Sequence, residues 1–258
     1  MLANYHTHTT RCKHAVGTER EYVEEAIKNG FKILGFSDHT PQPYPNGFVS
    51  GIRMDMSELP DYVDTILSLK EEYKGDIDIL IGYEVEYSQY FDELLKELRK
   101  YPLDYLLLGQ HYVKDEVNGF YVGAFANNNL TNEQLVECVD HTIEGMRTGM
   151  FTYLAHPDLF AFEGRDEFYL KEMARLVEAS IECDMPLEIN YYGFVDSRNY
   201  PCDRFFSLAS KMGAKFVLGC DAHEPGLLRQ PEDVPGLMDF LNRNNISITD
   251  NILKLKRL

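Results

Sequence analysis

The chain contains 258 residues, of which 44% are hydrophobic, so it can bury the core of one large α/β domain or of two small ones. A formal net charge of −17, with no basic cluster longer than the tail 254–257, disfavours nucleic acid as a partner. No apolar run reaches the roughly 20 residues of a membrane-spanning helix, and the amino terminus lacks a signal pattern, so we expect a cytoplasmic protein that does not bind membranes.

The first predicted element is a strand at 5–9, where β-branched threonines alternate with two histidines. Side chains two apart on a strand point to the same face, so His6 and His8 would present two imidazoles side by side. Such a pair is a chelating unit that needs further ligands from elsewhere in the chain. After it, Thr18 and Glu21 form a capping-box pattern that opens the first helix.

The rest of the chain repeats a pattern of a short apolar run followed by an amphipathic segment. The predicted strands after the first are 33–36, 77–82, 105–109, 151–155, 186–190 and 215–219, and the predicted helices are 18–30, 57–73, 88–100, 131–149, 167–183, 202–212 and 234–244. The segment 113–129 interrupts this order with glycine and aromatic residues, and we expect a hairpin or lid there. Seven alternations without a linker predict a parallel sheet covered by helices and closed into a single-domain barrel over 1–258.

Residues able to bind metal follow six of the seven predicted strands, at the carboxyl ends where barrel enzymes place their chemistry. They are His6, His8, His39, Glu84, His111, His156, Asp221 and His223, with His14 in the loop after the first strand. Structural histidines would not collect at strand ends, and only His141 lies in the middle of a predicted helix, where we expect an ordinary helical role.

Nine ligands are too many for one ion that keeps a position open for substrate, so the set suits two or three ions. Mixed imidazole and carboxylate ligands suit Zn, Fe or Mn better than Mg or Ca. Glu84 and Glu86 lie on the same strand face, and spacing leaves open which of them binds metal. Cys12 and Cys220 are near enough to compete as ligands, although Cys220 should face away from Asp221 and pack in the core.

Charge indicates the chemistry of such a centre. Three divalent ions, less two carboxylates and one hydroxide, leave about +3 to attract a phosphate dianion to an otherwise acidic protein. Paired metals also produce hydroxide at neutral pH, so hydrolysis of a phosphoester is the best-matched reaction. Arg165 and Arg198, on the loops after the fifth and sixth strands, are candidates to grip the phosphate, with a surface ion pair as the alternative for each.

These segments resemble the PHP (polymerase and histidinol phosphatase) superfamily, in particular its histidinol-phosphate phosphatase branch. The matching segments are His6-Thr7-His8-Thr9, Gly35-Phe36-Ser37-Asp38-His39-Thr40-Pro41, Gly82-Tyr83-Glu84, Gly109-Gln110-His111, Ala155-His156-Pro157 and Gly219-Cys220-Asp221-Ala222-His223. The run 37–41 and the turn 198–201 favour the phosphatase branch over the polymerase-associated one.

The resemblance implies a distorted (β/α)7 TIM-like barrel with three metal ions, Zn being preferred over Fe or Mn. It implies three ligand sets: His6, His8, Glu84 and Asp221; Glu84, His111 and His156, with Glu84 bridging; and His14, His39 and His223. It also implies catalytic roles for Glu84 and Asp221, and a phosphate-gripping role for Arg165 and Arg198. Many relatives carry a carboxylate where His14 stands.

The resulting hypothesis is a cytoplasmic enzyme of histidine biosynthesis that hydrolyses L-histidinol phosphate by attack of a metal-bridging hydroxide. The alternatives are a phosphoesterase acting on another small phosphomonoester or on a nucleic-acid phosphodiester, and a metal-binding module without turnover. The aromatic residues between Tyr112 and Phe125 are candidates to recognise the imidazole end, with core or lid packing as the alternative. The proton donor to the leaving group and the oligomeric state are left open.

Overall fold

The parallel strands of the protein curl into a distorted barrel. The computed structural model describes residues 1–123 and 129–258. Strands pair in parallel in the order β1 (Ala3–Asn4), β2 (Ile33–Phe36), β3 (Asp78–Val85) and β4 (Tyr105–Leu108), and separately β7 (Leu187–Asn190) with β8 (Phe216–Gly219).

Isolated bridges connect these two groups. Leu108 and Leu187 each pair with Leu154, and Thr7 pairs with Ala222 just beyond β8. The fold therefore agrees with the predicted (β/α)7 arrangement, except that the fifth predicted strand, 151–155, is reduced to the single bridge position Leu154.

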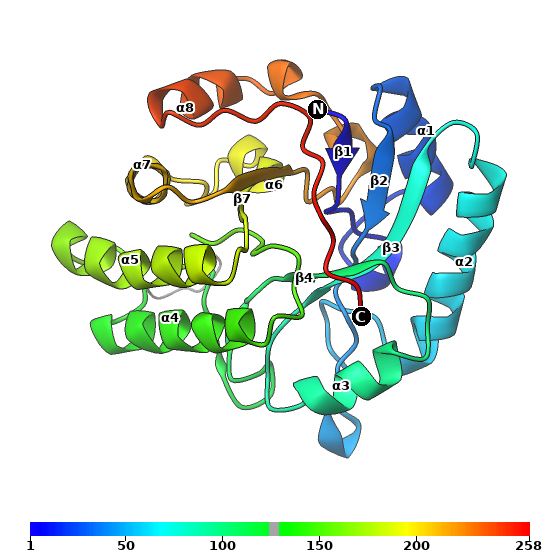
Figure 1. Cartoon of the computed structure of the whole chain (residues 1–258). Coiled ribbons are helices and arrows are strands. Elements are labelled where there is room, and N and C mark those ends of the chain that lie inside the picture. Colours follow the sequence, from blue (N-terminus) through cyan, green and yellow to red (C-terminus); the bar gives the residue numbers. More distant parts are fainter. Residues whose placement is uncertain (124–128) are drawn as a thin grey trace.

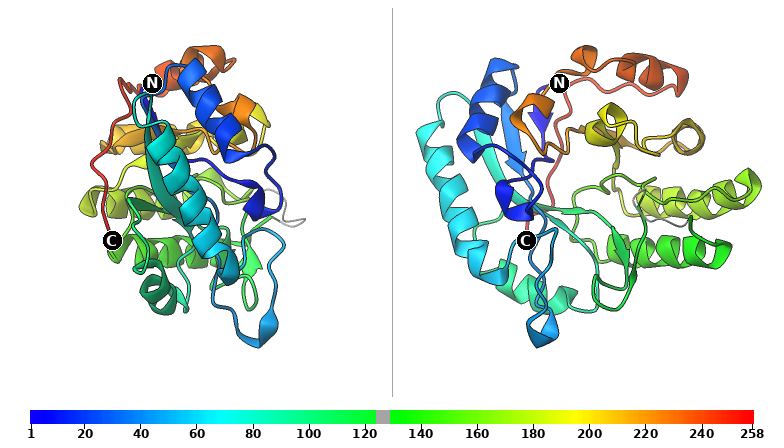
Figure 2. Two further views of the ribbon diagram at one scale, coloured as in Figure 1. Left: turned by 90° about the vertical axis from the view of Figure 1, so that its right-hand side faces the viewer. Right: turned by 180° about the vertical axis from the view of Figure 1, so that it is seen from behind.

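Helices surround the strands on the outside (Figures 1 and 2). They are α1 (Glu19–Lys28), α2 (Leu59–Glu72), α3 (Phe91–Leu98), α4 (Asn132–Arg147), α5 (Asp166–Glu182), α6 (Tyr191–Val195), α7 (Asp203–Met212) and α8 (Leu237–Arg243). The predicted capping box is present at α1, where Thr18 and Glu21 satisfy each other's backbone N–H groups. Within the described residues, no helix is long and apolar enough to cross a membrane.

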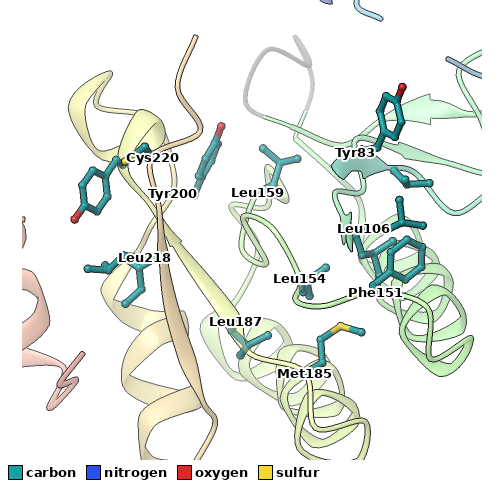
Figure 3. Close-up of a cluster of buried hydrophobic side chains, with 14 of the residues drawn as sticks. Tyr83, Leu106, Phe151, Leu154, Leu159, Met185, Leu187, Tyr200, Leu218 and Cys220 are labelled. Atoms are coloured by element: carbon teal, nitrogen blue, oxygen red, sulfur yellow. The ribbon is translucent and has the colours of Figure 1, made fainter. Parts of the chain in front are cut away.

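Two apolar clusters fix the barrel. The larger one packs the outer faces of the strands against the helices, and Figure 3 shows Leu106, Leu154 and Leu187 within it. The smaller one fills the barrel interior with Ala3, Tyr5, Leu80, Tyr105, Leu107, Tyr153, Ala155 and Val217. The carboxyl-terminal tail packs against this interior cluster through Leu253, whose N–H donates to the Tyr5 hydroxyl (3.0 Å). The barrel is thus apolar at the end that the tail covers, and its polar residues lie at the other end.

Local structure departs from the predictions where functional residues begin. Regular strand structure ends at Asn4, and of the predicted strand 5–9 only Thr7 pairs with a neighbour. His156 and Asp221 have φ angles of 28° and 47°, in the left-handed region that non-glycine residues avoid. These two left-handed residues lie just beyond the fifth and seventh predicted strands, where the chain enters the site.

The predicted hairpin after β4 is present. It consists of β5 (Tyr112–Val113) and β6 (Phe120–Tyr121), which pair antiparallel beside the carboxyl end of β4. Residues 124–128, including the candidate Phe125, lie outside the described residues.

Candidate metal centre

The nine predicted ligands lie together at the carboxyl ends of the strands. His8 is central, because its ring centroid lies 4.5 Å from that of His39 and 4.0 Å from that of His223. On the other side of the cluster, the ring of His111 lies 4.8 Å from that of His156. Residues more than 200 positions apart therefore meet in one place, as the strand-end pattern predicted. His141 lies apart from them in α4, where its Nε2 is 2.8 Å from the Tyr87 carbonyl oxygen.

Four buried atoms converge there, and none has a hydrogen-bond partner among the described residues: His6 Nε2, His8 Nε2, Glu84 Oε2 and Asp221 Oδ1. Asp221 Oδ1 lies 2.9 Å from His8 Nε2 and 3.4 Å from His6 Nε2, and Glu84 Oε2 lies 3.5 Å from both nitrogens. Leaving a buried polar group unpaired costs about 1–3 kcal/mol, so four such atoms at one point need an explanation. A cation bound between them would satisfy all four.

The second oxygen of Glu84 faces a different pair of histidines. Glu84 Oε1 lies 2.7 Å from His156 Nε2 and 3.8 Å from His111 Nε2. Because its two oxygens face separate groups of imidazoles, Glu84 has the geometry of a carboxylate that bridges two ions. Glu86 reaches only the opposite nitrogen of His111, Nδ1 (3.4 Å), so the structure distinguishes the two glutamates that spacing left equivalent.

The third group contains His14, His39 and His223. His14 Nε2 and His223 Nε2 lie only 3.0 Å apart, whereas His39 directs Nδ1 at Glu84 Oε2 (2.9 Å). Cys12 also approaches this group, since its sulfur and the ligand atoms of His14 and His223 all lie within 4.8 Å of one another. Cys220, by contrast, packs in the larger apolar cluster, as its position next to Asp221 predicted.

Carboxylates and imidazoles in this cluster shift one another's pKa. Burial opposes ionisation of Glu84, yet the surrounding imidazoles, with His39 and His111 foremost, lower its pKa well below the usual value. Burial likewise disfavours the charged form of His6, but Glu188 and Asp221 raise its pKa well above the usual value. These carboxylates therefore favour the protonated form of His6, whereas burial, the largest cause, lowers the pKa of His39 and His223 well below the usual value.

A cavity of about 380 Å³ opens over the cluster. Its floor contains His14, His39, Glu84, His111, Asp221 and His223, and its walls include Ile52, Tyr112, Tyr121, Leu159, Tyr192, Arg198 and Tyr200. A polar floor beneath aromatic walls is typical of a pocket for a small molecule that has one charged end.

A match to the PHP domain family covers residues 4–192. The chain belongs to the PHP domain family.

Several relatives of this PHP protein match it over most of their length. It is 30% identical over 234 residues to a Deinococcus radiodurans protein named "Probable histidinol-phosphatase", covering 87% of each chain. It is 30% identical over 249 residues to a Schizosaccharomyces pombe protein of the same name, covering 87% of this chain and 81% of the relative. Its fold matches the crystal structure of a Lactococcus lactis histidinol phosphate phosphatase complexed with Zn, L-histidinol and phosphate, with a TM-score of 0.71, 20% identity and coverage of 95% and 94%.

The structure separates the two predicted phosphate-gripping arginines. Arg198 lines the cavity, where its guanidinium lies 4.1 Å from the Tyr192 ring centroid and donates to the Tyr200 hydroxyl (3.1 Å). Arg165 is exposed at the start of α5 and lines a neighbouring depression instead, so the structure does not bring it to the metal centre.

Sequence reasoning missed the residues that orient the histidines of this PHP protein. Glu188, on β7, is fully buried, and its Oε1 lies 2.7 Å from His6 Nδ1. Asp38 Oδ1 lies 3.3 Å from His8 Nδ1. Such carboxylates hold a metal-binding imidazole in the tautomer that presents Nε2 to the ion. A charged residue inside the apolar run of β7 was the available signal for Glu188.

A second buried network was also missed. Arg53, from the loop after β2, is 1% exposed and donates to Glu86 Oε1 (2.6 Å) and Glu116 Oε2 (2.9 Å). Glu86 Oε1 in turn lies 3.4 Å from His111 Nδ1. Glu86 thus orients an imidazole rather than facing the centre, and Arg53 ties the long loop to it.

Two glycines, which have no side chain, leave the space that the Glu84 and Glu188 carboxylates occupy. A Cβ atom on Gly109 would overlap the Glu84 carboxylate, and one on Gly219 would overlap that of Glu188. The glycines in the segments 109–111 and 219–223 are therefore required by close approach of side chains from neighbouring strands.

Proposed function

We propose that the protein is a metal-dependent phosphomonoesterase that hydrolyses L-histidinol phosphate to L-histidinol and phosphate in histidine biosynthesis. The observation that carries this proposal is the convergence of four unpartnered ligand atoms, from His6, His8, Glu84 and Asp221, beneath a cavity that also contains Arg198. Relatives named as histidinol-phosphatases, aligned over most of the chain, support the choice of substrate.

The donor set fits divalent metal ions. Imidazole nitrogens and carboxylate oxygens favour Zn, with Fe and Mn as alternatives. We assign three ions to the three groups described above, with Glu84 shared between the first two. Bound ions of this kind supply a hydroxide nucleophile at neutral pH and offset the charge of the phosphate.

The protein's own residues would hold the substrate and fix the ligands. Arg198, anchored by Tyr192 and Tyr200, presents a guanidinium that can grip two phosphate oxygens. The aromatic walls offer flat surfaces against which the imidazole ring of the substrate can stack. Glu188 and Asp38 contact Nδ1 of His6 and His8, which leaves Nε2 of each ring directed at the metal site.

A cytosolic site of action remains part of the proposal. All five cysteines, Cys12, Cys138, Cys183, Cys202 and Cys220, are free thiols, as expected in a reducing compartment. The formal charge of −17 supports a small substrate over a nucleic acid.

Phosphate release from a substrate panel tests the proposal. With Zn or Mn present, kcat/KM for L-histidinol phosphate should exceed that for glycerol phosphate or AMP by at least about 100-fold, equivalent to about 2.7 kcal/mol. His8→Ala should abolish turnover, whereas His141→Ala, a histidine outside the cluster, should retain it. Equal rates on all substrates would reject this choice of substrate, and degradation of single-stranded DNA would favour a phosphodiesterase. Tight metal uptake without any hydrolysis would favour a binding module.

A further inference from the structure

Hydrolysis of an alkyl phosphate leaves an alkoxide, which is a strong base and needs a proton as the P–O bond breaks. Most ionisable groups of the cavity already have another proposed role and are not free to donate this proton. The histidines and carboxylates of its floor form the candidate metal centre, and the guanidinium of Arg198 stays protonated. Among the described lining residues, this leaves the phenols of Tyr112, Tyr121, Tyr192 and Tyr200 as donors.

Only one of these phenols is oriented by a charged donor in the described part of the chain. Arg198 Nη1 donates to the Tyr200 hydroxyl oxygen at 3.1 Å. A phenol that accepts a hydrogen bond through its oxygen keeps its own proton for another acceptor. Among the described residues the Tyr200 hydroxyl proton has no acceptor, and Tyr200 lines the cavity. The proton is therefore available to a molecule bound there.

The ring of Tyr200 is held rigidly. It is 3% exposed and packs over Gly193, where a Cβ atom would overlap the ring. The backbone on either side is tethered, because Asn199 Nδ2 donates to the Leu159 carbonyl oxygen (3.2 Å) and the Cys202 N–H donates to Asp158 Oδ2 (2.6 Å). Figure 3 shows the ring beside Leu159 with its hydroxyl pointing away from the apolar cluster.

The position also suits contact with a phosphate ester. The Tyr200 ring centroid lies 5.9 Å from that of His156, so the phenol stands between the proposed metal ligands and the arginine that would grip the phosphate. We propose that Tyr200 is the catalytic residue that protonates the leaving alkoxide oxygen. This inference rests on the proposed phosphomonoesterase function.

In this step the oxygen of the attacking hydroxide bonds to phosphorus as the P–O ester bond breaks. The electron pair of the broken bond goes to the leaving oxygen, which takes the phenol proton. The resulting phenolate lies beside the Arg198 guanidinium, which stabilises the negative charge, and it regains a proton from water when the alcohol departs. No oxidant or further reactant is needed.

Two substrates that differ in leaving group test the proposal. L-Histidinol phosphate releases an alkoxide that needs a proton, whereas p-nitrophenyl phosphate releases a weakly basic phenolate that does not. Tyr200→Phe should lower kcat on the first substrate by about 100-fold or more and on the second by less than about threefold. Tyr73→Phe, which removes a hydroxyl from a surface network with Arg20 and Glu24, should change neither rate.

Equal losses on both substrates would overturn the proposal, because they would mean that Tyr200 acts only by holding Arg198. If Tyr200→Phe fails to fold, 3,5-difluorotyrosine in place of Tyr200 keeps the ring and hydroxyl but makes the phenol more acidic. It should then change the ratio of the two rates severalfold, and an unchanged ratio would overturn the proposal. A wild-type enzyme without preference for histidinol phosphate would instead reject the proposed function, so the two failures are distinct.

Discussion

Glu188→Gln tests whether Glu188 orients the His6 ring so that its Nε2 can bind metal. Each carboxylate oxygen of Glu188 accepts from two donors. Oε1 accepts from His6 Nδ1 (2.7 Å) and the Tyr153 hydroxyl (3.3 Å), and Oε2 accepts from the His156 N–H (2.9 Å) and Asn190 Nδ2 (2.9 Å). A glutamine has nearly the same shape but only one accepting oxygen.

Either orientation of the new amide therefore harms the site. If its oxygen keeps the His156 N–H, its NH2 faces His6 Nδ1, and the imidazole proton is forced onto Nε2, the atom that should bind metal. If its oxygen still accepts from His6 Nδ1, the buried His156 N–H loses its acceptor. An unpaired buried donor costs about 1–3 kcal/mol, and loss of a carboxylate that orients a ligand typically costs about 10–100-fold in metal affinity.

The assay is a competition for Zn between the protein and a chromophoric chelator at neutral pH, with thermal unfolding of the metal-free protein measured in parallel. Glu188→Gln should weaken metal binding by about 10–100-fold and lower the unfolding temperature. Glu178→Gln, the same change at an exposed position on α5, should do neither. Wild-type metal affinity in Glu188→Gln would refute the reasoning.

Three further predictions follow from the same geometry. Gly109→Ala should displace the Glu84 carboxylate and reduce the bound metal measured by elemental analysis, and full metal content would contradict the packing argument. Arg198→Met should lower kcat/KM for phosphate monoesters by about 10–100-fold through loss of a charge-assisted contact, whereas Arg165→Met should change it less than about twofold. An equal loss in both variants would instead support the sequence-based prediction that both arginines grip the phosphate. Because Glu188 and Asp221 outweigh burial and raise the pKa of His6, Zn binding to the metal-free protein at neutral pH should release protons and strengthen as pH rises, and calorimetry in buffers of different ionisation enthalpy should detect that release.

Strand and helix patterns predicted the fold well because they depend on local periodicity. The run Ile33–Phe36 became a strand as predicted, and the Thr18 capping box starts α1. The prediction was weaker for the fifth strand, where only Leu154 forms bridges to neighbouring strands ahead of the left-handed turn at His156. The short helix α6, whose first turn is capped by Asn190, had no periodic pattern long enough to detect.

The positions of the candidate ligands could be predicted because the carboxyl ends of parallel strands must meet. Which residues support them depends on contacts between strands and loops that are distant in sequence. Glu188 faces His6 across 182 positions, and Arg53 reaches Glu86 from a long loop without regular pattern. The place of Arg165 likewise depends on the path of the chain into α5, which spacing alone does not define.

We propose that the buried cluster at the carboxyl ends of the strands binds metal ions that the hydrolysis of L-histidinol phosphate requires. The most direct test of this proposal is to strip the protein with a chelator and follow phosphate release from L-histidinol phosphate while Zn is added back in known amounts. Activity should be absent at first and should rise with bound metal to a plateau at a small whole number of ions per chain. Full activity in the stripped protein, or none after complete metal uptake, would contradict the account.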